Sequence, residues 1–175
     1  MNSADLESGI AATPFVQGMS HRHVEFLASC ACRIHFNGGQ IIFRQSETAN
    51  RFYLIEAGAV ELLAATKSGN RRIVAGNIGP DGVLGWSWLF PPYEWQFTAR
   101  ASWETSAIFF YATILREHCE ADPSLGFELF KRMAAEMVKR LQSARRRLLE
   151  SRPSFSLIDG EPPITAEPRL ARWKD

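Results

Sequence analysis

The stretch that most constrains the fold runs from Phe43 to Glu61 and reads FRQSETANRFYLIEAGAVE. Apolar and polar residues alternate along it, and Gly58 interrupts the alternation near its end. A period of two is typical of a strand with one buried face, and glycine allows the backbone of a turn. This stretch therefore predicts two strands of a compact β-roll.

Similar runs recur before and after it, separated by turn residues such as Asn37-Gly38-Gly39 and Lys67-Ser68-Gly69-Asn70. We expect strands over Cys32–Phe36, Gln40–Arg44, Phe52–Glu56, Val60–Ala65, Arg71–Ala75, Thr98–Trp103 and Ala107–Tyr111. About eight short strands without intervening long helices favour a mainly β fold, a jelly-roll-like β-roll with flanking helices, over a parallel βαβ sheet.

Helical periods appear only at the two ends of this β region. Ser20 is a candidate N-cap for a short amphipathic helix over residues 21–30. Asp122 and Pro123 have the residue types of an N-cap and a first helical position, and they predict a second, long helix that runs to about Glu150.

The long helix has the spacing of a coiled-coil seam, with apolar positions separated by 4, 3, 4, 3 and 4 residues. The seam consists of Phe130, Ala134, Met137, Leu141, Ala144 and Leu148. Leu129, Met133 and Val138 widen the apolar stripe, so we expect the first half of the helix also to pack on its own domain. The spacing leaves two alternatives, a dimer interface or a helix that folds back in a monomer.

The same helix is basic, with eight basic residues against three acidic ones between residues 124 and 152. The basic residues are Lys131, Arg132, Lys139, Arg140, Arg145, Arg146, Arg147 and Arg152. They fit an ordinary solvated face, since cations suit a helix C-terminus, and they also fit a docking surface for an acidic partner.

The segment from Ile78 to Ala101 reads IGPDGVLGWSWLFPPYEWQFTARA and predicts a functional site. It joins a glycine-bounded apolar strand end, a short turn of helix and a proline-broken return to β structure. The first N–H groups of a helix have no internal partners and carry partial positive charge. Such a turn can therefore bind an anion.

Together these segments resemble the cyclic nucleotide-binding domain of catabolite activator-like proteins, gated channels and kinases. The resemblance covers roughly residues 20–150 and rests on residues 42–47, Phe52-Tyr53-Leu54-Ile55, Gly58, Val60 and the turn from Gly85 to Phe90. It implies a sensor domain of the catabolite activator or Fnr type, and it favours a parallel homodimer through the long helix.

The resemblance also exposes a departure at the ligand site. The family's cyclic AMP and GMP binders carry Gly-Glu at the start of the phosphate-binding turn and Arg-Ser or Arg-Thr before the next strand. Here Gly85 is followed by Trp86, and Trp95-Gln96 replace the Arg-Ser pair. A charge-assisted hydrogen bond is worth roughly 1.5–3 kcal/mol, and about 1.4 kcal/mol is tenfold in affinity. Two such losses turn micromolar binding into millimolar binding.

Four aromatic residues, Trp86, Trp88, Tyr93 and Trp95, lie within ten residues of this turn. They can stack on a planar ligand or fill the pocket themselves. The candidate ligand-binding positions are the seven residues Gly85, Trp86, Ser87, Trp88, Trp95, Gln96 and Arg100. Of these, Ser87 can accept an anion and Arg100 is the nearest cation.

Composition excludes several classes of function. With 20 Lys+Arg against 19 Asp+Glu, no global field recruits nucleic acid or an anionic membrane. No apolar run is long enough to span a bilayer, and the N-terminus lacks a signal peptide pattern, so we expect a cytoplasmic protein.

No histidine lies between His35 and His118, which removes the metal ligands of cupin enzymes, and no nucleophile–base pair replaces them. We therefore expect no enzymatic activity.

The three cysteines, Cys30, Cys32 and Cys119, do not suit a disulfide framework. A metal site of Cys30, Cys32 and His35 is conceivable from residue types, but buried apolar cysteines are the simpler interpretation.

We expect a flexible segment over 1–18, the cyclic nucleotide-binding-like domain over 19–150, and a disordered, Pro-rich tail over 151–175 without a helix-turn-helix. The predicted function is a regulatory or sensor module that binds a non-standard ligand or none and acts through a homodimer or an unidentified protein partner. It has no certain cofactor, and cyclic nucleotide is disfavoured. The alternatives are a genuine cyclic nucleotide-binding signalling protein and a constitutive dimerisation scaffold.

Overall fold

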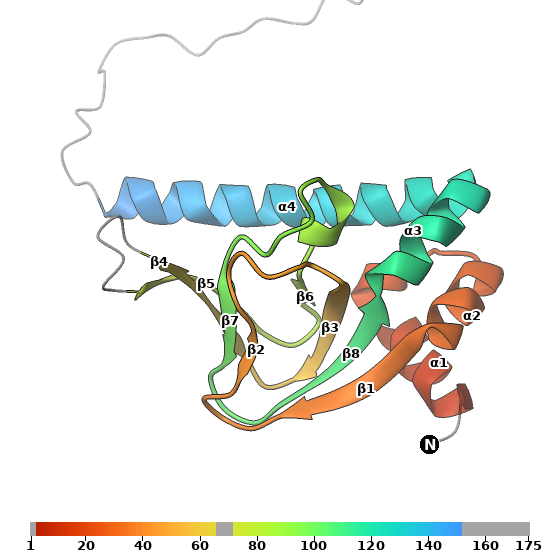
Figure 1. The fold of residues 1–175 in the computed structure, drawn as a ribbon, viewed down its shortest axis with the longest axis horizontal. Helices are drawn as coiled ribbons and strands as arrows, with labels where there is room; N and C mark the ends of the chain where they lie inside the picture. Colours follow the sequence, from red (N-terminus) through yellow and green to blue (C-terminus); the bar gives the residue numbers. More distant parts are fainter. Residues whose placement is uncertain (1–2, 66–71, 152–175) are drawn as a thin grey trace, which may run out of the picture. The chain divides into compact units, whose positions relative to one another are not determined.

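The computed structural model describes residues 3–65 and 72–151. The strands form two four-stranded antiparallel sheets with the orders β1-β8-β3-β6 and β2-β7-β4-β5, and they curl into a roll (Figure 1). The strands are β1 Ala31–Phe36, β2 Ile41–Phe43, β3 Arg51–Ala57, β4 Val60–Ala65, β5 Arg72–Ile78, β6 Val83–Leu84, β7 Thr98–Ala101 and β8 Thr105–Tyr111. The predicted β-roll is confirmed.

Four α-helices and two short 3₁₀ helices lie among the described residues. They are α1 Ser3–Ala12, η1 Pro14–Val16, α2 His21–Ser29, η2 Ser87–Leu89, α3 Ala112–Ala121 and α4 Pro123–Glu150. The short helix and the long helix that the sequence predicts are confirmed. The Ser20 hydroxyl accepts a hydrogen bond from the His23 N–H, and the Asp122 carboxylate accepts from the Ser124 and Leu125 N–H groups.

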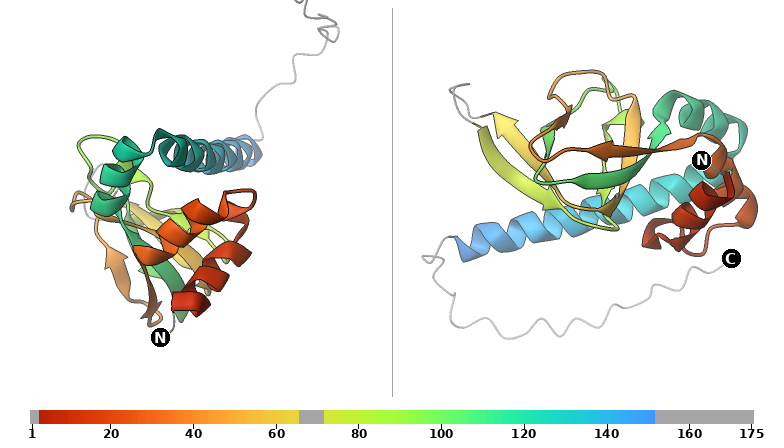
Figure 2. Two further views of the ribbon diagram at one scale, coloured as in Figure 1. Left: turned by 90° about the vertical axis from the view of Figure 1, so that its right-hand side faces the viewer. Right: turned by 90° about the horizontal axis from the view of Figure 1, so that it is seen from below.

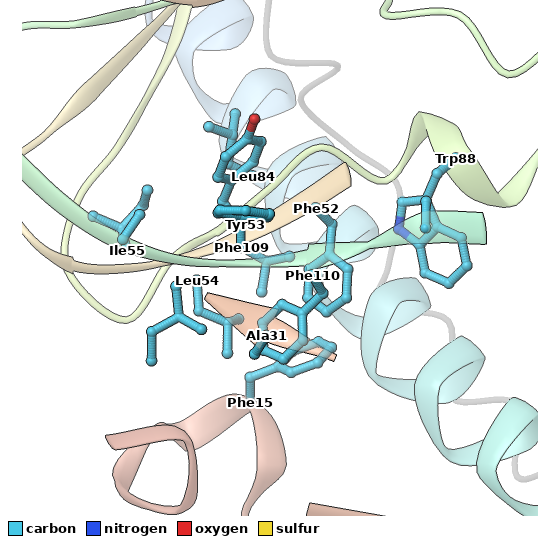
Figure 3. Packing of buried hydrophobic residues seen from close by; sticks show 14 of the residues in the cluster. Phe15, Ala31, Phe52, Tyr53, Leu54, Ile55, Leu84, Trp88, Phe109 and Phe110 are labelled. Atoms are coloured by element: carbon cyan, nitrogen blue, oxygen red, sulfur yellow. The ribbon is translucent and has the colours of Figure 1, made fainter. Parts of the chain in front are cut away.

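The core is an aromatic stack that runs between the strands and the surrounding helices. Phe52 of β3 stacks on Phe110 of β8 with ring centroids 4.4 Å apart. Phe15 of η1 lies against one side of Phe52 and Trp88 of η2 against the other, as Figure 3 shows. Segments that are distant in sequence, the N-terminal segment and the turn at η2, therefore share one packing unit with β3 and β8.

The N-terminal segment, for which we expect flexibility over 1–18, forms two helices that the sequence does not predict. Residues 1 and 2 lie outside the described part, but residues 3–16 form α1 and η1, and Leu6, Ile10, Phe15 and Val16 are buried. Figure 2 shows α1 and α2 side by side, next to β1. The sequence hid this packing because α1 is short and weakly amphipathic, so the apolar residues that it buries do not form a clear helical period.

Arg132 of α4 ties this segment to the long helix. Its guanidinium donates to the carbonyl oxygens of Phe15 at 2.9 Å and Gln17 at 2.8 Å, and to the carboxylate of Glu128 at 3.1 Å. These hydrogen bonds give partners to backbone carbonyl groups that lie outside both sheets. The N-terminal segment is thus held by polar as well as apolar contacts.

Helix α4 buries one face and exposes another. Leu125, Leu129 and Met133 are buried, as expected for Leu129 and Met133, whereas Val138 is exposed and its expected intramolecular packing is wrong. The chain divides after Val138 into two units, residues 1–138 and 139–175. The predicted disordered tail spans 151–175, and all of it except Ser151 lies outside the described part of the chain.

We predict that Ile10→Ala lowers the free energy of unfolding by about 2–5 kcal/mol, because it leaves a cavity beneath α1. The control is Ile114→Ala on the exposed side of α3, where the cost is below about 1 kcal/mol. Urea denaturation followed by circular dichroism measures both. Equal small losses in the two variants would show that the N-terminal segment is not packed.

Candidate ligand-binding cassette

The candidate site is the connection from β6 to β7, residues 85–97, which we call the cassette. It contains η2, whose turn is closed by hydrogen bonds from Leu89 N–H to the Trp86 carbonyl at 3.0 Å and from Phe90 N–H to the Ser87 carbonyl at 3.4 Å. The short turn of helix that the sequence predicts is therefore present. Since β6 and β7 belong to different sheets, the cassette connects the two sheets.

Gly85 opens the cassette with a backbone that other residues rarely adopt. Its φ is +89°, and a Cβ atom on it would lie 2.7 Å and 2.9 Å from Cζ3 and Cη2 of Trp95. Real Cβ contacts are longer, so only glycine fits at this position. The Trp95 indole therefore rests directly on the backbone of the turn for which the sequence predicts phosphate binding.

Trp95 is part of the core. Only 4% of its surface is exposed, and its ring stacks on Phe43 with centroids 3.8 Å apart and an interplanar angle of 11°. The backbone N–H of Trp95 donates to the Glu47 carbonyl, and the backbone carbonyl of Trp95 accepts from the Ser46 N–H, both at 2.9 Å. Backbone and ring are thus both fixed, and the indole cannot swing aside without breaking this packing.

Trp88 is also buried, with 1% of its surface exposed. Its ring stacks on Phe52 at 5.8 Å between centroids, and Figure 3 shows it facing the aromatic core. Within the described residues its Nε1 has no hydrogen-bond partner. A buried donor left unpaired costs about 1–3 kcal/mol, so the stacking of this ring must offset that penalty.

Arg116 of α3 is a cassette contact that sequence reasoning missed. Its guanidinium donates to the Trp88 carbonyl at 3.1 Å and lies 4.6 Å from the centre of the Tyr93 ring. The only available signal was its helical position four residues after Ala112, which does not identify a partner. Arg116 holds the cassette onto α3, and its charge interacts with the protein's own groups.

Arg100, the expected cation, is also paired. It lies opposite Glu61 in the β4–β7 register, and its guanidinium donates to that carboxylate at 2.6 Å and 3.2 Å. The sequence could not reveal this pair because it depends on which strands are neighbours. An ion pair of this kind reduces the positive charge available to a phosphate.

The remaining candidates line a small hollow on the cassette surface. Its volume is about 200 Å³, and it is lined by Trp86, Ser87, Phe90, Pro91 and Gln96. Ligand pockets usually start at about 300 Å³. Among the residues that the structure describes, no cationic or acidic side chain lines this hollow. Of the seven predicted positions, the structure therefore brings Trp86, Ser87 and Gln96 together, places Gly85, Trp88 and Trp95 in packing roles, and pairs Arg100 elsewhere.

The other predicted features can be placed as well. All six seam residues lie on α4, with Phe130 half exposed and Leu141 and Leu148 exposed.

The cysteines are free, and burial raises the pKa of the Cys30 thiol to about 12. Among the described residues, no three His, Cys, Asp or Glu side chains form a possible metal site, so Cys30, Cys32 and His35 do not form one. No helix in the described ranges has the length and apolarity needed to span a bilayer.

Comparison with known proteins identifies the family. The model of the cyclic nucleotide-binding domain matches residues 33–122, and the chain belongs to that family. No match was found among curated proteins.

Solved structures show the same fold at low sequence identity. A putative cyclic nucleotide-binding protein from Geobacter metallireducens is 23% identical, with a TM-score of 0.68 over 81% of this chain and 98% of the other. A cyclic nucleotide-binding domain from Methylobacillus flagellatus is 14% identical, with a TM-score of 0.71 over 86% and 84%. The regulatory subunit of a cAMP-independent protein kinase A from Trypanosoma cruzi, bound to guanosine, is 16% identical, with a TM-score of 0.65 over 85% and 51%.

We predict that Gly85→Ala destabilises the protein through two separable effects. The positive φ costs about 1–2 kcal/mol, and the clash with the Trp95 ring adds about 1–3 kcal/mol. In a Trp95→Ala background only the first effect should remain, so a double-mutant cycle of urea unfolding measures the contact.

Gly39→Ala is the matched control for this cycle, because Gly39 has a φ of +82° and a Cβ added there would meet nothing within 4 Å. It should cost about 1–2 kcal/mol in either background. If Gly85→Ala costs the same with and without the indole, Trp95 does not occupy the turn in solution.

Proposed function

We propose that this chain is a regulatory module of the cyclic nucleotide-binding family whose cassette is closed to cyclic nucleotides by its own aromatic side chains. The observation that carries the proposal is the Trp95 indole, which lies against Gly85 and stacks on Phe43. A second messenger bound in the customary way needs a phosphate at this turn, with a cation beside it. The Trp95 indole lies against this turn and carries no charge.

The energetic barrier to the usual ligand is large. Displacing a buried tryptophan forfeits stabilisation of the order of 3–5 kcal/mol, judged by the cost of truncating such a side chain. The incoming phosphate would then lack the guanidinium contact worth roughly 1.5–3 kcal/mol. Each effect alone weakens binding by tenfold or more.

A ligand that suits the remaining surface is planar and uncharged. The hollow presents the Trp86 indole, the Ser87 hydroxyl and the Gln96 amide, which can stack on a ring and form neutral hydrogen bonds. The Trypanosoma cruzi relative, described as cAMP-independent and bound to guanosine, supports the idea that this fold can work with a ligand that has no phosphate. A constitutive module that binds nothing is the remaining possibility within this proposal.

The cassette is connected to the helices through contacts that can transmit a change. Phe90, at the rim of the hollow, meets Phe130 of α4 edge to face at 6.5 Å, and Arg116 joins Trp88 and Tyr93 to α3. A ligand that moves Phe90 would therefore change the exposed apolar surface of α4. We propose this contact as the coupling between the cassette and the interface.

In this proposal the module acts as a homodimer whose two copies pair through α4. Phe130 follows the buried Leu129 and therefore lies about 100° around the helix from it, which leaves about half of its surface exposed. Apolar residues at heptad spacing before residue 139, Phe130, Ala134 and Met137, favour a second copy as the partner of this part of the helix. We place the protein in the cytoplasm, where its thiols stay reduced.

We predict that cyclic AMP and cyclic GMP bind the full chain more weakly than about millimolar in isothermal titration calorimetry. Guanosine and adenosine, titrated in parallel, test whether removal of the phosphate improves binding. A Trp86→Glu/Trp95→Arg variant restores the two charged side chains of the family pattern and should bind cyclic nucleotide more tightly than the wild type. A micromolar dissociation constant for the wild type and either cyclic nucleotide would overturn the proposal.

We predict that Ala134→Glu converts the dimer to a monomer, because it puts a carboxylate into the seam of each copy. Ala135→Glu is the control, since it makes the same chemical change at the adjacent, exposed position. Sedimentation velocity at micromolar concentration distinguishes the two. A wild-type chain that sediments as a monomer, or equal effects of the two variants, would rule out this interface.

A further inference from the structure

The C-terminal end of α4, residues 139–150, combines exposed leucines with exposed arginines. Leu141 is 70% and Leu148 is 59% exposed, and the whole stretch from 141 to 150 is exposed. We infer that this stretch, which we call the basic end, is a docking surface for an acidic amphipathic helix of a partner protein. The inference concerns the basic end alone and does not depend on the ligand of the cassette.

The apolar part of the basic end is a narrow seam. Leu141 and Leu148 are seven residues apart, which places them nearly in line on a helix, and the small Ala144 lies between them on the same side. A stripe of this width fits the side chains of one other helix, whereas a globular surface would need a broader apolar face. The geometry therefore points to a helical partner.

The positive charges of the basic end determine that the partner helix must be acidic. Arg145 and Arg147 occupy the two positions that flank the seam, and Arg146 extends the same charge around the helix. None of the ion pairs in the described residues involves these three arginines. Between residues 139 and 150 there are five basic residues and one acidic residue, Glu150. A partner with carboxylates beside its own apolar seam would complement them.

A second copy of the chain is a poor occupant of the basic end. In a parallel two-helix coil, a residue that flanks the seam lies opposite the residue five positions away in the other helix. Arg145 would then face position 140 of the second copy, which is also an arginine. Like charges at these positions destabilise pairing and select against it. The homodimer proposed above can use Phe130, Ala134 and Met137 and leave the basic end to a different protein.

Lipid and nucleic acid fit the surface less well. A helix that lies on a membrane buries a broad apolar face, commonly with aromatic residues, whereas residues 139–150 contain three leucines and no aromatic residue. Nucleic acid would satisfy the arginines but offers nothing to the exposed leucines. An acidic helix satisfies both features at once.

The test uses two synthetic helical peptides of about four heptads with leucine at the seam positions. One carries glutamate and the other lysine at every flanking position, and neither pairs well with itself. We expect the full-length chain to bind the glutamate peptide at least about tenfold more tightly than the lysine peptide in fluorescence anisotropy, with a difference that shrinks as salt is added.

Charge reversal in the protein sharpens the test. The R145E/R147E variant should reverse the preference and bind the lysine peptide more tightly. The control R44E/R72E makes the same change in net charge at two exposed positions of the roll and should keep the wild-type preference. R145Q/R147Q, which should lose the preference without reversing it, gives a second measurement if the reversed variant does not fold by circular dichroism.

Equal binding of both peptides, or an unchanged preference in R145E/R147E, would overturn the inference. So would tighter binding to vesicles of phosphatidylserine and phosphatidylcholine, or to duplex DNA, than to the glutamate peptide. These outcomes are separate from those for the proposed function. Calorimetry measures ligand binding at the cassette, and sedimentation of the Ala134→Glu variant measures the oligomeric state. Each proposal can therefore fail alone.

Discussion

The contact between Trp95 and the backbone of Gly85 is the constraint on which the rest of the cassette depends. An indole can lie this close to a turn only if the turn residue has no Cβ, and it stays there because Phe43 covers its other side. Gly85 and Phe43 therefore hold the indole between them.

The aromatic core connects the cassette with the rest of the domain. From Trp88 through Phe52 to Phe110, stacked rings connect the cassette with both β3 and β8. Arg116 adds a polar connection from the cassette to α3, and Asp122 then begins α4 by capping it. Hydrogen bonds from Ser124 and Leu125 hold the pKa of the Asp122 carboxyl at about 2, so the cap remains ionised at neutral pH. The cassette and the first turns of α4 are thus parts of one packed unit.

Much of the fold could be predicted from sequence, because its signals are local. Alternation and turn residues located the strands, and Ser20 and Asp122 marked two helix starts. Heptad spacing identified three exposed apolar residues of α4, Phe130, Leu141 and Leu148. The N-terminal helix was missed because its burial depends on contacts with α2 and β1, which no local period reports. At the site, sequence reasoning identified the cluster of aromatic residues but could not separate the packed indoles, Trp88 and Trp95, from Trp86 at the hollow. Side-chain direction within an irregular turn depends on neighbours from distant strands.

The sequence by itself determined that this chain forms a cyclic nucleotide-binding roll, that its cassette is rich in tryptophan, and that its long helix is basic with a heptad seam. These are properties of residue type and spacing, and they hold whatever the neighbours are. Only the tertiary structure decided that Arg100 is paired with Glu61, that Arg116 contacts the cassette, and that Trp95 fills the turn. Each of these depends on which strands and helices are adjacent, and adjacency arises only when the two sheets close around a common core.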